Sequence, residues 1–434
     1  MTVGRSKKQI SFSHWEWLIF IGVSALLLRL LLAVGYRNGF DLNPYNIPWA
    51  LGTQDGVFQI YHNLENLDYP PLFPFLLSFV GKGVSLGIEL ESWPVQMFFI
   101  KLIPVLFDVG NVLLLYWIGC RKSQSFGMLL SSLWAVNGSM LLNCSLWGQT
   151  DSLLLFFILL TFWMFWENKP VAAAVCFAFG CLAKLQMAYF APVVLFELLT
   201  RQEIKTALKA FGLGLLTGIL GWLPFMVGSG EMFLPLRIYF GGFGKYSYIN
   251  VNAYNLYGIW GGNWVTDRAS LIGGNYSETY GTVTGGFTYS HLSFLFLGLV
   301  FLLVLAGYFV SVWFQRKVPA VLHGMMFLNG IFMLTTKMHE RYQLPVMVLS
   351  LLCFFVLEEK LYLWSYLLLT VITCVNQAMV LFQANYGGIF KELFGGFQTA
   401  FSIVNLLLFF VLLWDYVSRV LLNCTFWGKP LEKM

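Results

Sequence analysis

The sequence VPAVLHGMMFLNGIFMLTTKMHERY, from Val318 to Tyr342, joins an almost uninterrupted apolar run to a charged cluster. The cluster KMHER, Lys337 to Arg341, has three side chains that can be cationic and one carboxylate. Where charges are scarce, a membrane span that ends in such a cluster usually presents it to a polar ligand. The alternative is an interfacial anchor, in which Lys and Arg reach for lipid head groups. An anchor needs neither His339 nor Glu340, so the ligand interpretation is favoured.

The composition of the whole chain indicates a membrane protein. Hydrophobic residues make up 58% of the 434 and charged residues 11%, and the mean hydropathy is +0.71. A soluble domain has about 25% charged residues. A net charge of +5 would suggest a nucleic-acid or acidic partner in a soluble chain. In a membrane protein the location of the basic residues matters more than their sum, and we expect no nucleic-acid partner.

Apolar segments of spanning length predict an all-α polytopic fold in one integral membrane domain, residues 1–434. The run from Trp17 to about Val34 follows Arg5, Lys7 and Lys8 and lacks a small-residue cleavage site, so we interpret it as the first span rather than a cleaved signal peptide. The further spans expected, which make twelve to within one or two, are roughly 95–119, 125–145, 150–166, 171–184, 187–200, 206–228, 291–315, 318–336, 343–358, 361–382 and 398–418.

Basic residues suggest the orientation of these spans. With both termini cytoplasmic, fifteen of the 26 Lys and Arg residues fall in short inner loops or tails, as the positive-inside rule requires. Two long segments, about 37–94 and 228–291, then lie outside. They contain FDLNPYNIPW (40–49), DYPPLFPF (68–75) and YINVNAYNLYGIWGG (248–262), and we expect short surface helices in them. Loops of this length usually carry a function.

The same orientation brings every unusual polar cluster to the outer side. Asp41 follows the first span, WGQTD (147–151) precedes the fourth, and Lys184 and Lys337–Arg341 end the fifth and ninth. Aromatic and amide residues such as Asn252 and Asn255 suit carbohydrate, although an interfacial aromatic belt would also be rich in Tyr and Trp. One shared extracytoplasmic site is therefore expected.

Carboxylates and cations at a membrane surface suit transfer of a sugar from a lipid phosphate. A carboxylate takes the proton of the incoming hydroxyl and cations stabilise the departing phosphate. Asp41 is the first candidate base, followed by Asp68 and Asp151. The candidate phosphate and sugar ligands, led by the KMHER cluster, are Lys184, Arg237, Lys245, Asn252, Asn255, Lys337, His339, Glu340 and Arg341.

Each carboxylate also has a structural explanation. Asp41 and Asp151 suit helix N-caps, and Asp68 before Tyr69, Pro70 and Pro71 suits the start of a turn. Asp108 and Asn111 lie inside the second span and are expected to bond neighbouring helices, and His323 is expected to be a packed polar residue. No sequence motif indicates a metal or other cofactor, although a divalent metal stays possible.

Taken together and in order, these motifs resemble a known family. An outer Asp after the first span, YPPLFPF, FDVGNVLLLY, WGQTD, NAYNLYG and KMHERYQLP are typical of bacterial membrane mannosyltransferases related to the second mannosyltransferase of GPI-anchor synthesis. The resemblance covers roughly residues 37–345 and implies a GT-C glycosyltransferase. Such enzymes invert the anomeric centre, use polyprenyl- or dolichyl-phosphate sugars, and carry an acidic residue in the first outer loop. By position that residue is Asp41 here, followed by Asp68.

The resemblance also implies that Asp151, His339, Glu340 and Arg341 border the donor site. The first outer loop has no adjacent pair of acidic residues, which argues against a tightly bound divalent metal. We therefore expect a hexosyltransferase, with mannose favoured, that uses a polyprenyl-phosphate sugar and a glycan, glycolipid or protein acceptor. The alternative is a transporter or flippase of lipid-linked sugars.

Overall fold

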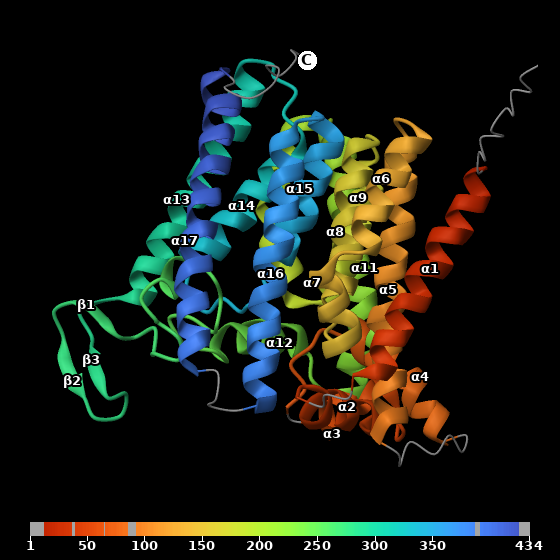
Figure 1. Cartoon of the computed structure of the whole chain (residues 1–434), viewed down its shortest axis with the longest axis vertical. Coiled ribbons are helices and arrows are strands. Elements are labelled where there is room, and N and C mark those ends of the chain that lie inside the picture. The colour runs from red at the N-terminus through yellow and green to blue at the C-terminus, as the bar shows by residue number, and fades with distance from the viewer. Residues whose placement is uncertain (1–12, 37–39, 65, 86–92, 387–390, 425–434) are drawn as a thin grey trace, which may run out of the picture.

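The computed structural model describes residues 13–36, 40–64, 66–85, 93–386 and 391–424. Helices run side by side through most of the molecule, and smaller elements gather at one end (Figure 1). The longest helices are α1 (His14–Gly35), α5 (Trp93–Cys120), α11 (Ile204–Ser229), α13 (Tyr289–Trp313), α16 (Lys360–Tyr386) and α17 (Lys391–Tyr416). The chain continues from α17 into a π-helical turn, Val417–Leu422.

Seven shorter helices pack among the long ones. They are α6 (Gln124–Ala135), α7 (Gly138–Met140), α8 (Asp151–Trp166), α9 (Pro170–Ala183), α10 (Ala191–Arg201), α14 (Ala320–Leu334) and α15 (Leu344–Leu357). Helices α14 and α15 are buried along almost their whole length. By contrast, α11 leaves most of its apolar side chains exposed and α13 many of them, as expected for helices that face lipid.

Fewer of the described helices are long and apolar enough to cross a membrane than the twelve spans expected from the sequence. Among the described helices, six have the length and composition to cross a membrane, and α6 followed by Gly138–Trp147 forms a seventh candidate bent by 42°. These helices indicate a multi-pass integral membrane protein. A helix lies in each range expected from the sequence, but α9, α10, α14 and α15 have 14, 11, 15 and 14 residues, so twelve crossings stay a prediction.

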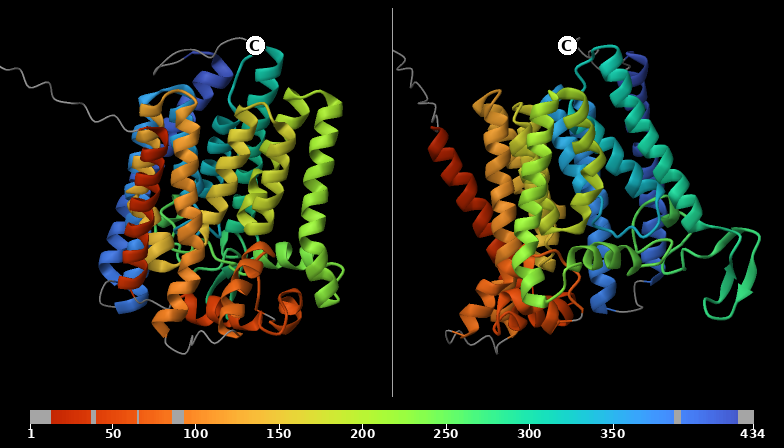
Figure 2. Two further views of the ribbon diagram at one scale, coloured as in Figure 1. Left: turned by 90° about the vertical axis from the view of Figure 1, so that its right-hand side faces the viewer. Right: turned by 180° about the vertical axis from the view of Figure 1, so that it is seen from behind.

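One end of the bundle carries the elements of the two long polar segments, and we call it the loop end. The first segment forms α2 (Ile47–Gly52), α3 (Ile60–Asn63) and α4 (Leu72–Ser85), and the second forms α12 (Leu234–Gly244) and a 3-10 turn, Leu256–Gly258. All lie together in Figure 1 and in both views of Figure 2. The predicted segment 37–94 also includes residues 37–39, 65 and 86–92, which lie outside the described residues.

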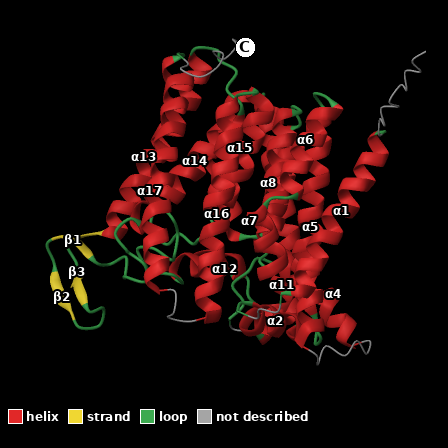
Figure 3. Cartoon of the chain, viewed as in Figure 1, coloured by secondary structure: helices red, strands yellow, loops and turns green. Residues whose placement is uncertain are grey.

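The second segment adds four short strands to a fold that is otherwise helical, as the sequence predicts. It contains β1 (Ser270–Ile272) paired with β4 (Phe287–Thr288), and β2 (Asn275–Ser277) paired with β3 (Thr282–Thr284), both antiparallel. These strands project sideways beyond α13 (Figures 2 and 3). Strands of two or three residues give too short an alternation of polar and apolar side chains to be recognised in sequence.

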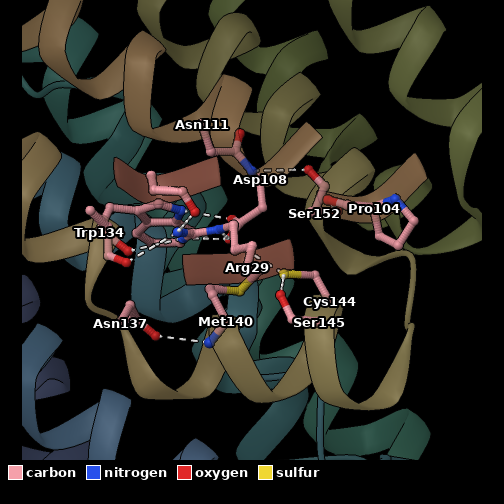
Figure 4. A network of polar contacts seen from close by, with 12 residues as sticks. Arg29, Pro104, Asp108, Asn111, Trp134, Asn137, Met140, Cys144, Ser145 and Ser152 are labelled. Atoms are coloured by element: carbon pink, nitrogen blue, oxygen red, sulfur yellow. Dashed lines mark hydrogen bonds and ion pairs between the residues drawn. The ribbon is translucent and has the colours of Figure 1, made fainter. Parts of the chain in front are cut away.

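A sealed polar network ties α1, α5 and α6 together (Figure 4). Arg29 and Asp108, both without exposed surface, form an ion pair of 2.7 Å, and Trp134 Nε1 donates to Asp108 at 2.9 Å. Asn111 Nδ2 donates to the carbonyl oxygen of Ser152 at 3.1 Å. The prediction that Asp108 and Asn111 bond neighbouring helices is confirmed.

His323 also has the predicted packing role. Its Nδ1 lies 2.7 Å from the hydroxyl of Tyr416, and its ring stacks on Tyr308 with 4.0 Å between centroids. Near the loop end, Lys101 is fully buried and donates to the carbonyl oxygen of Tyr36 at 2.8 Å. Because the last carbonyls of a helix lack partners within it, this lysine completes the end of α1.

Candidate functional site

A narrow pocket of about 110 Å³ opens at the loop end. Its walls come from the region of α2, the turn before α4, the residues before α8, the chain after α9, the end of α12 and the link between α14 and α15. The polar and aromatic residues that line it are Asp41, Tyr45, Asn46, Trp49, Asp68, Tyr69, Gln149, Thr150, Lys184, Gln186, Lys245, Tyr246, Arg341 and Tyr342. Five of the predicted site residues therefore meet in one pocket: Asp41, Asp68, Lys184, Lys245 and Arg341.

Asp41 is held by the WGQTD segment and does not cap a helix. It precedes a π-helical turn, Leu42–Asn46, without a side-chain cap hydrogen bond. Its Oδ2 accepts hydrogen bonds from Trp147 Nε1 at 2.8 Å and from Gln149 Nε2. Among the hydrogen bonds of the described residues, none involves Oδ1. The carboxylate is thus fixed through one oxygen and retains the other for a ligand.

The turn that delivers both donors depends on Gly148. Its φ of 85° lies in the left-handed region, which glycine adopts without the steric cost that a side chain would carry. A Cβ atom at this position would also lie 3.1 Å from side-chain atoms of both Leu42 and Lys101. A larger residue here would displace Trp147 and Gln149 from Asp41.

Asp68 forms an ion pair with Lys245 across the pocket. Asp68 Oδ2 lies 2.7 Å from Lys245 Nζ, and both side chains are about one third exposed. The Lys245 ammonium also lies over the ring of Tyr45, 5.3 Å from its centroid. Partial burial lowers the pKa of Lys245, but the hydrogen bond and the charge of Asp68 outweigh it, so the pKa is raised overall. Lys245 is therefore a permanent cation at the mouth of the pocket.

Asp151 lies behind the pocket and holds its two other cations. This residue is 2% exposed, and its oxygens contact Lys184 Nζ and Asn143 Nδ2, the latter at 3.0 Å. Arg341 Nε lies 3.7 Å from Asp151 Oδ2, and Arg341 Nη1 donates to Glu340 at 2.5 Å. Asp151 starts α8 without capping it, because its oxygens are used by these cations. Its position suits an electrostatic support more than a base.

His339 is buried by the chain that packs against the KMHER cluster. Its ring centroid lies 4.5 Å from that of Tyr246 and 4.9 Å from that of Tyr342, and its backbone forms β-bridges with Val251 and Asn252. Burial lowers the pKa of His339, and the charges of Arg341 and Lys184 lower it further. His339 is therefore neutral near pH 7, so its environment argues against the cationic role that the sequence allows.

Glu340 is buried beside Arg341. Burial raises the pKa of Glu340, and the nearby guanidinium acts in the opposite direction. Tyr69, whose hydroxyl lies 3.5 Å from the Thr150 hydroxyl, has its pKa raised by burial to about 12. It stays protonated and can donate a hydrogen bond.

The structure places four predicted residues away from the pocket. Arg237 pairs with Glu231 at 2.8 Å on an exposed surface, and Lys337 lies 3.4 Å from Asp267. Asn255 caps the 3-10 turn, accepting from the backbone N–H groups of Tyr257 and Gly258. Asn252 has a φ of 62°, and its backbone N–H donates to Asn263 Oδ1 at 2.9 Å. Both asparagines shape the loop that packs on His339.

Several pocket residues were not chosen from the sequence. Tyr45, Asn46 and Trp49 come from FDLNPYNIPW, Tyr69 from DYPPLFPF and Gln149 from WGQTD. These residues lie in the same motifs as the predicted charged residues, and this position in the sequence is the feature from which they could have been predicted. Only the charged residues of these three motifs are among the predicted site residues, although their amide and aromatic side chains line the pocket as well.

Comparison with known proteins leaves the family open. No family model matches this chain, and no curated protein matches it.

Proposed function

We propose that this protein is an integral membrane glycosyltransferase that moves a hexose from a polyprenyl-phosphate donor to an acceptor hydroxyl. The observation that carries the proposal is the meeting of two carboxylates and three cations, Asp41, Asp68, Lys184, Lys245 and Arg341, in one pocket at the end of a helical membrane bundle. Permanent charges are costly near a bilayer and usually mark a polar substrate. The cations suit a phosphate, and the partly exposed carboxylates suit a base.

The reaction needs one base and one site for a leaving group. The acceptor hydroxyl loses its proton to the base as its oxygen bonds to C1 of the sugar. The bond between C1 and the phosphate oxygen breaks, and its electron pair leaves with the lipid phosphate. One displacement of this kind inverts the configuration at C1. Positive charge beside the phosphate stabilises the negative charge that develops there.

Asp41 is the carboxylate best arranged to take the proton. Trp147 and Gln149 fix one of its oxygens and leave Oδ1 as the basic atom. Asp68 is engaged by Lys245, and Asp151 is buried behind Lys184. An oriented, partly exposed carboxylate that is not in an ion pair meets the geometric requirement for a general base best.

Arg341, Lys184 and Lys245 are proposed to hold the donor phosphate. Arg341 offers a planar head with several donors, and Asp151 and Glu340 keep it at the pocket wall. Tyr45, Trp49 and Gln149 give rings and an amide to a sugar beside it. Mannose is favoured by the family resemblance, as are a glycan, glycolipid or protein acceptor and an extracytoplasmic site.

The test is sugar transfer by the full chain in nanodiscs. Purified protein is mixed with radiolabelled polyprenyl-phosphate mannose or glucose and with candidate glycan, glycolipid and peptide acceptors. Label should move to an acceptor with wild-type protein and with Asp55→Asn, since Asp55 is exposed and outside the pocket, but not with Asp41→Asn. In sealed vesicles, movement of intact labelled donor across the bilayer without transfer would instead show a transporter.

A further inference from the structure

A second and larger cavity lies at the end of the bundle opposite the candidate site. Its volume is about 750 Å³, within the range of about 300–1,000 Å³ that is usual for small-molecule pockets. Its walls are the last turns of α8, α10 and α15, the first turn of α14 and the chain near Arg419. Nothing in the proposed transfer reaction uses this cavity.

Two cations, Arg201 and Lys317, line this cavity. Arg201 ends α10, and its Nη2 donates to the carbonyl oxygen of Val318 at 3.0 Å. Lys317, the preceding residue, also lines the cavity and is exposed. The hydrogen bond therefore holds the Arg201 guanidinium at the backbone of the residue that follows Lys317. Two cations that line one cavity favour the binding of an anion there.

The other charged residues nearby are already committed to protein partners. Arg419 Nη2 lies 3.0 Å from Asp415, and its Nη1 lies 3.8 Å from Glu359. Glu197, one turn before Arg201, is 6% exposed and accepts from the Tyr308 hydroxyl at 3.0 Å. The negative charge of Glu197 offsets part of the positive charge of Arg201. Positive charge thus remains on the rim, and mostly at Lys317.

The inner wall of the cavity is apolar and aromatic. It is formed by Phe162, Trp163, Phe165, Trp166, Leu352 and Phe355. Tryptophan is enriched where membrane helices meet the head-group region. A free phosphate or a sugar phosphate would leave this wall uncovered. A ligand with a long hydrocarbon chain and an anionic head would use both the wall and the rim.

We propose that the cavity binds one molecule of a phosphate-headed lipid. Its phosphate lies between Lys317 and Arg201, and its chain lies against the wall formed by α8 and α15. Two sources share this chemistry: an anionic phospholipid of the surrounding bilayer, and a polyprenyl phosphate. The site is separate from the pocket at the loop end, so it can be tested by binding alone, without the transfer reaction.

The first experiment measures lipid retention by native mass spectrometry. The full chain is released from detergent after incubation with phosphatidylglycerol, phosphatidylcholine or undecaprenyl phosphate. Wild-type protein should retain one phosphate-headed anionic lipid and much less of the zwitterionic one. Lys317→Glu should lower this retention about tenfold, because one contact is lost and a repulsive one is gained. Lys205→Glu, the same charge change at an exposed position on the same end, should change it less than twofold.

A second variant keeps the test independent of charge. Val356 is half-buried and lines the cavity, so Val356→Trp should fill it and displace the lipid. A lipid with a photoreactive group in its chain should label the peptide that contains Trp163 and Trp166 in wild-type protein, but not in this variant. The stronger competitor, phosphatidylglycerol or undecaprenyl phosphate, identifies the source. Labels confined to the exposed faces of α11 and α13, with equal retention by all variants, would mean annular lipid only and would overturn the proposal.

Discussion

Two buried ion-pair networks of this protein use the same residue types in different ways. The first, which we call the sealed pair, joins Arg29 to Asp108, and neither side chain has exposed surface. Backbone carbonyls of Ala25 and Ala135 and the indole of Trp134 take up the remaining bonding capacity. The second, the pocket cluster, joins Asp151 to Lys184 and Arg341 and lies against the open pocket.

The difference lies in how completely each cation is used. In the sealed pair, Arg29 Nε lies 2.7 Å from Asp108. In the pocket cluster, Arg341 Nε lies 3.7 Å from Asp151. This nitrogen atom is buried and has no hydrogen-bond partner among the described residues, although 16% of the Arg341 side chain as a whole is exposed. A charge inside a membrane protein is therefore not by itself a sign of function. What distinguishes Arg341 from Arg29 is that its side chain lines a pocket and is not fully hydrogen-bonded.

The largest effect on turnover is expected for a change at Asp41, which lines the pocket. Asp41→Asn keeps the size of the side chain and removes its basic oxygen. If Asp41 takes the acceptor proton, turnover should fall by about 10²–10⁴ while donor binding survives. Transfer rate and donor affinity are measured on the same preparation. Asp55→Asn is the matched control.

Variants of two neighbouring carboxylates, Asp68 and Asp151, distinguish a catalytic role from a role in positioning the cations. Asp68→Asn should reduce turnover less, because Asp68 is engaged by Lys245. Asp151→Asn should weaken donor binding as well as rate, because it holds two cations. Turnover of Asp41→Asn close to wild type would remove Asp41 as the base and move the assignment to one of these two.

The sealed pair should respond through stability. Arg29→Met leaves the Asp108 carboxylate buried without its cation, which should cost about 3–5 kcal/mol of stability. Replacing both partners, Arg29→Met with Asp108→Leu, should recover much of this loss, because no charge is then left unpaired. Thermal unfolding in one detergent measures both variants.

An exposed ion pair provides the reference for this measurement. Arg121 lies 2.7 Å from Glu167, with 49% of the Arg121 side chain exposed, and such pairs contribute about 0–1 kcal/mol. Arg121→Met should therefore change the stability of the protein very little. Equal losses for Arg29→Met and Arg121→Met would show that the sealed pair contributes no more than a surface contact.

The general arrangement was predictable from sequence, whereas the partners of single side chains were not. The alternation of spans is enough to bring WGQTD, Lys184 and KMHER to one end, and the structure has them there. Asn255 and Arg237 have the chemistry of sugar and phosphate ligands, but a local partner is available to each: a turn of its own chain for Asn255 and Glu231 for Arg237. The sequence alone does not show which residue will be close enough to form a hydrogen bond or ion pair with a given loop side chain.

The pocket cluster should respond chiefly through donor affinity, with a smaller loss of stability than Arg29→Met, because the Arg341 side chain is partly exposed and that of Arg29 is not. Arg341→Ala should weaken donor binding by about 2–4 kcal/mol, the cost of losing a buried charged contact. Arg341→Lys should weaken it less, because the charge stays and the planar head is lost. Isothermal titration with a soluble short-chain donor measures both. Arg237→Ala, at an exposed pair outside the pocket, should bind donor like wild type.

The comparison would fail if Arg341→Ala lost stability to the same degree as Arg29→Met. It would also fail if a well-folded Arg341→Ala protein bound donor normally. In the second case the KMHER cluster would be an interfacial anchor, the alternative that the sequence left open.

The smallest effect is expected at His339, the member of KMHER that the structure keeps neutral. Because its pKa is lowered, His339 gains no proton as the pH falls from 8 to 6, and it adds no positive charge for the donor. The sugar phosphodiester carries one negative charge over this range. Donor affinity should therefore show no rise at low pH that depends on His339, and His339→Gln should change affinity at pH 8 by less than about threefold.

The measurement is donor affinity at pH 8, 7 and 6 for wild type, His339→Gln and the control His62→Gln, since His62 is exposed on α3. A protonated His339 would attract the phosphate, so affinity would rise with falling pH in wild type and in the control but not in His339→Gln. That result would return His339 to the cationic role and show that the pocket is wetter around Tyr246 and Tyr342 than their packing indicates. Parallel curves for all three proteins would leave Arg341, Lys184 and Lys245 as the cations of the site.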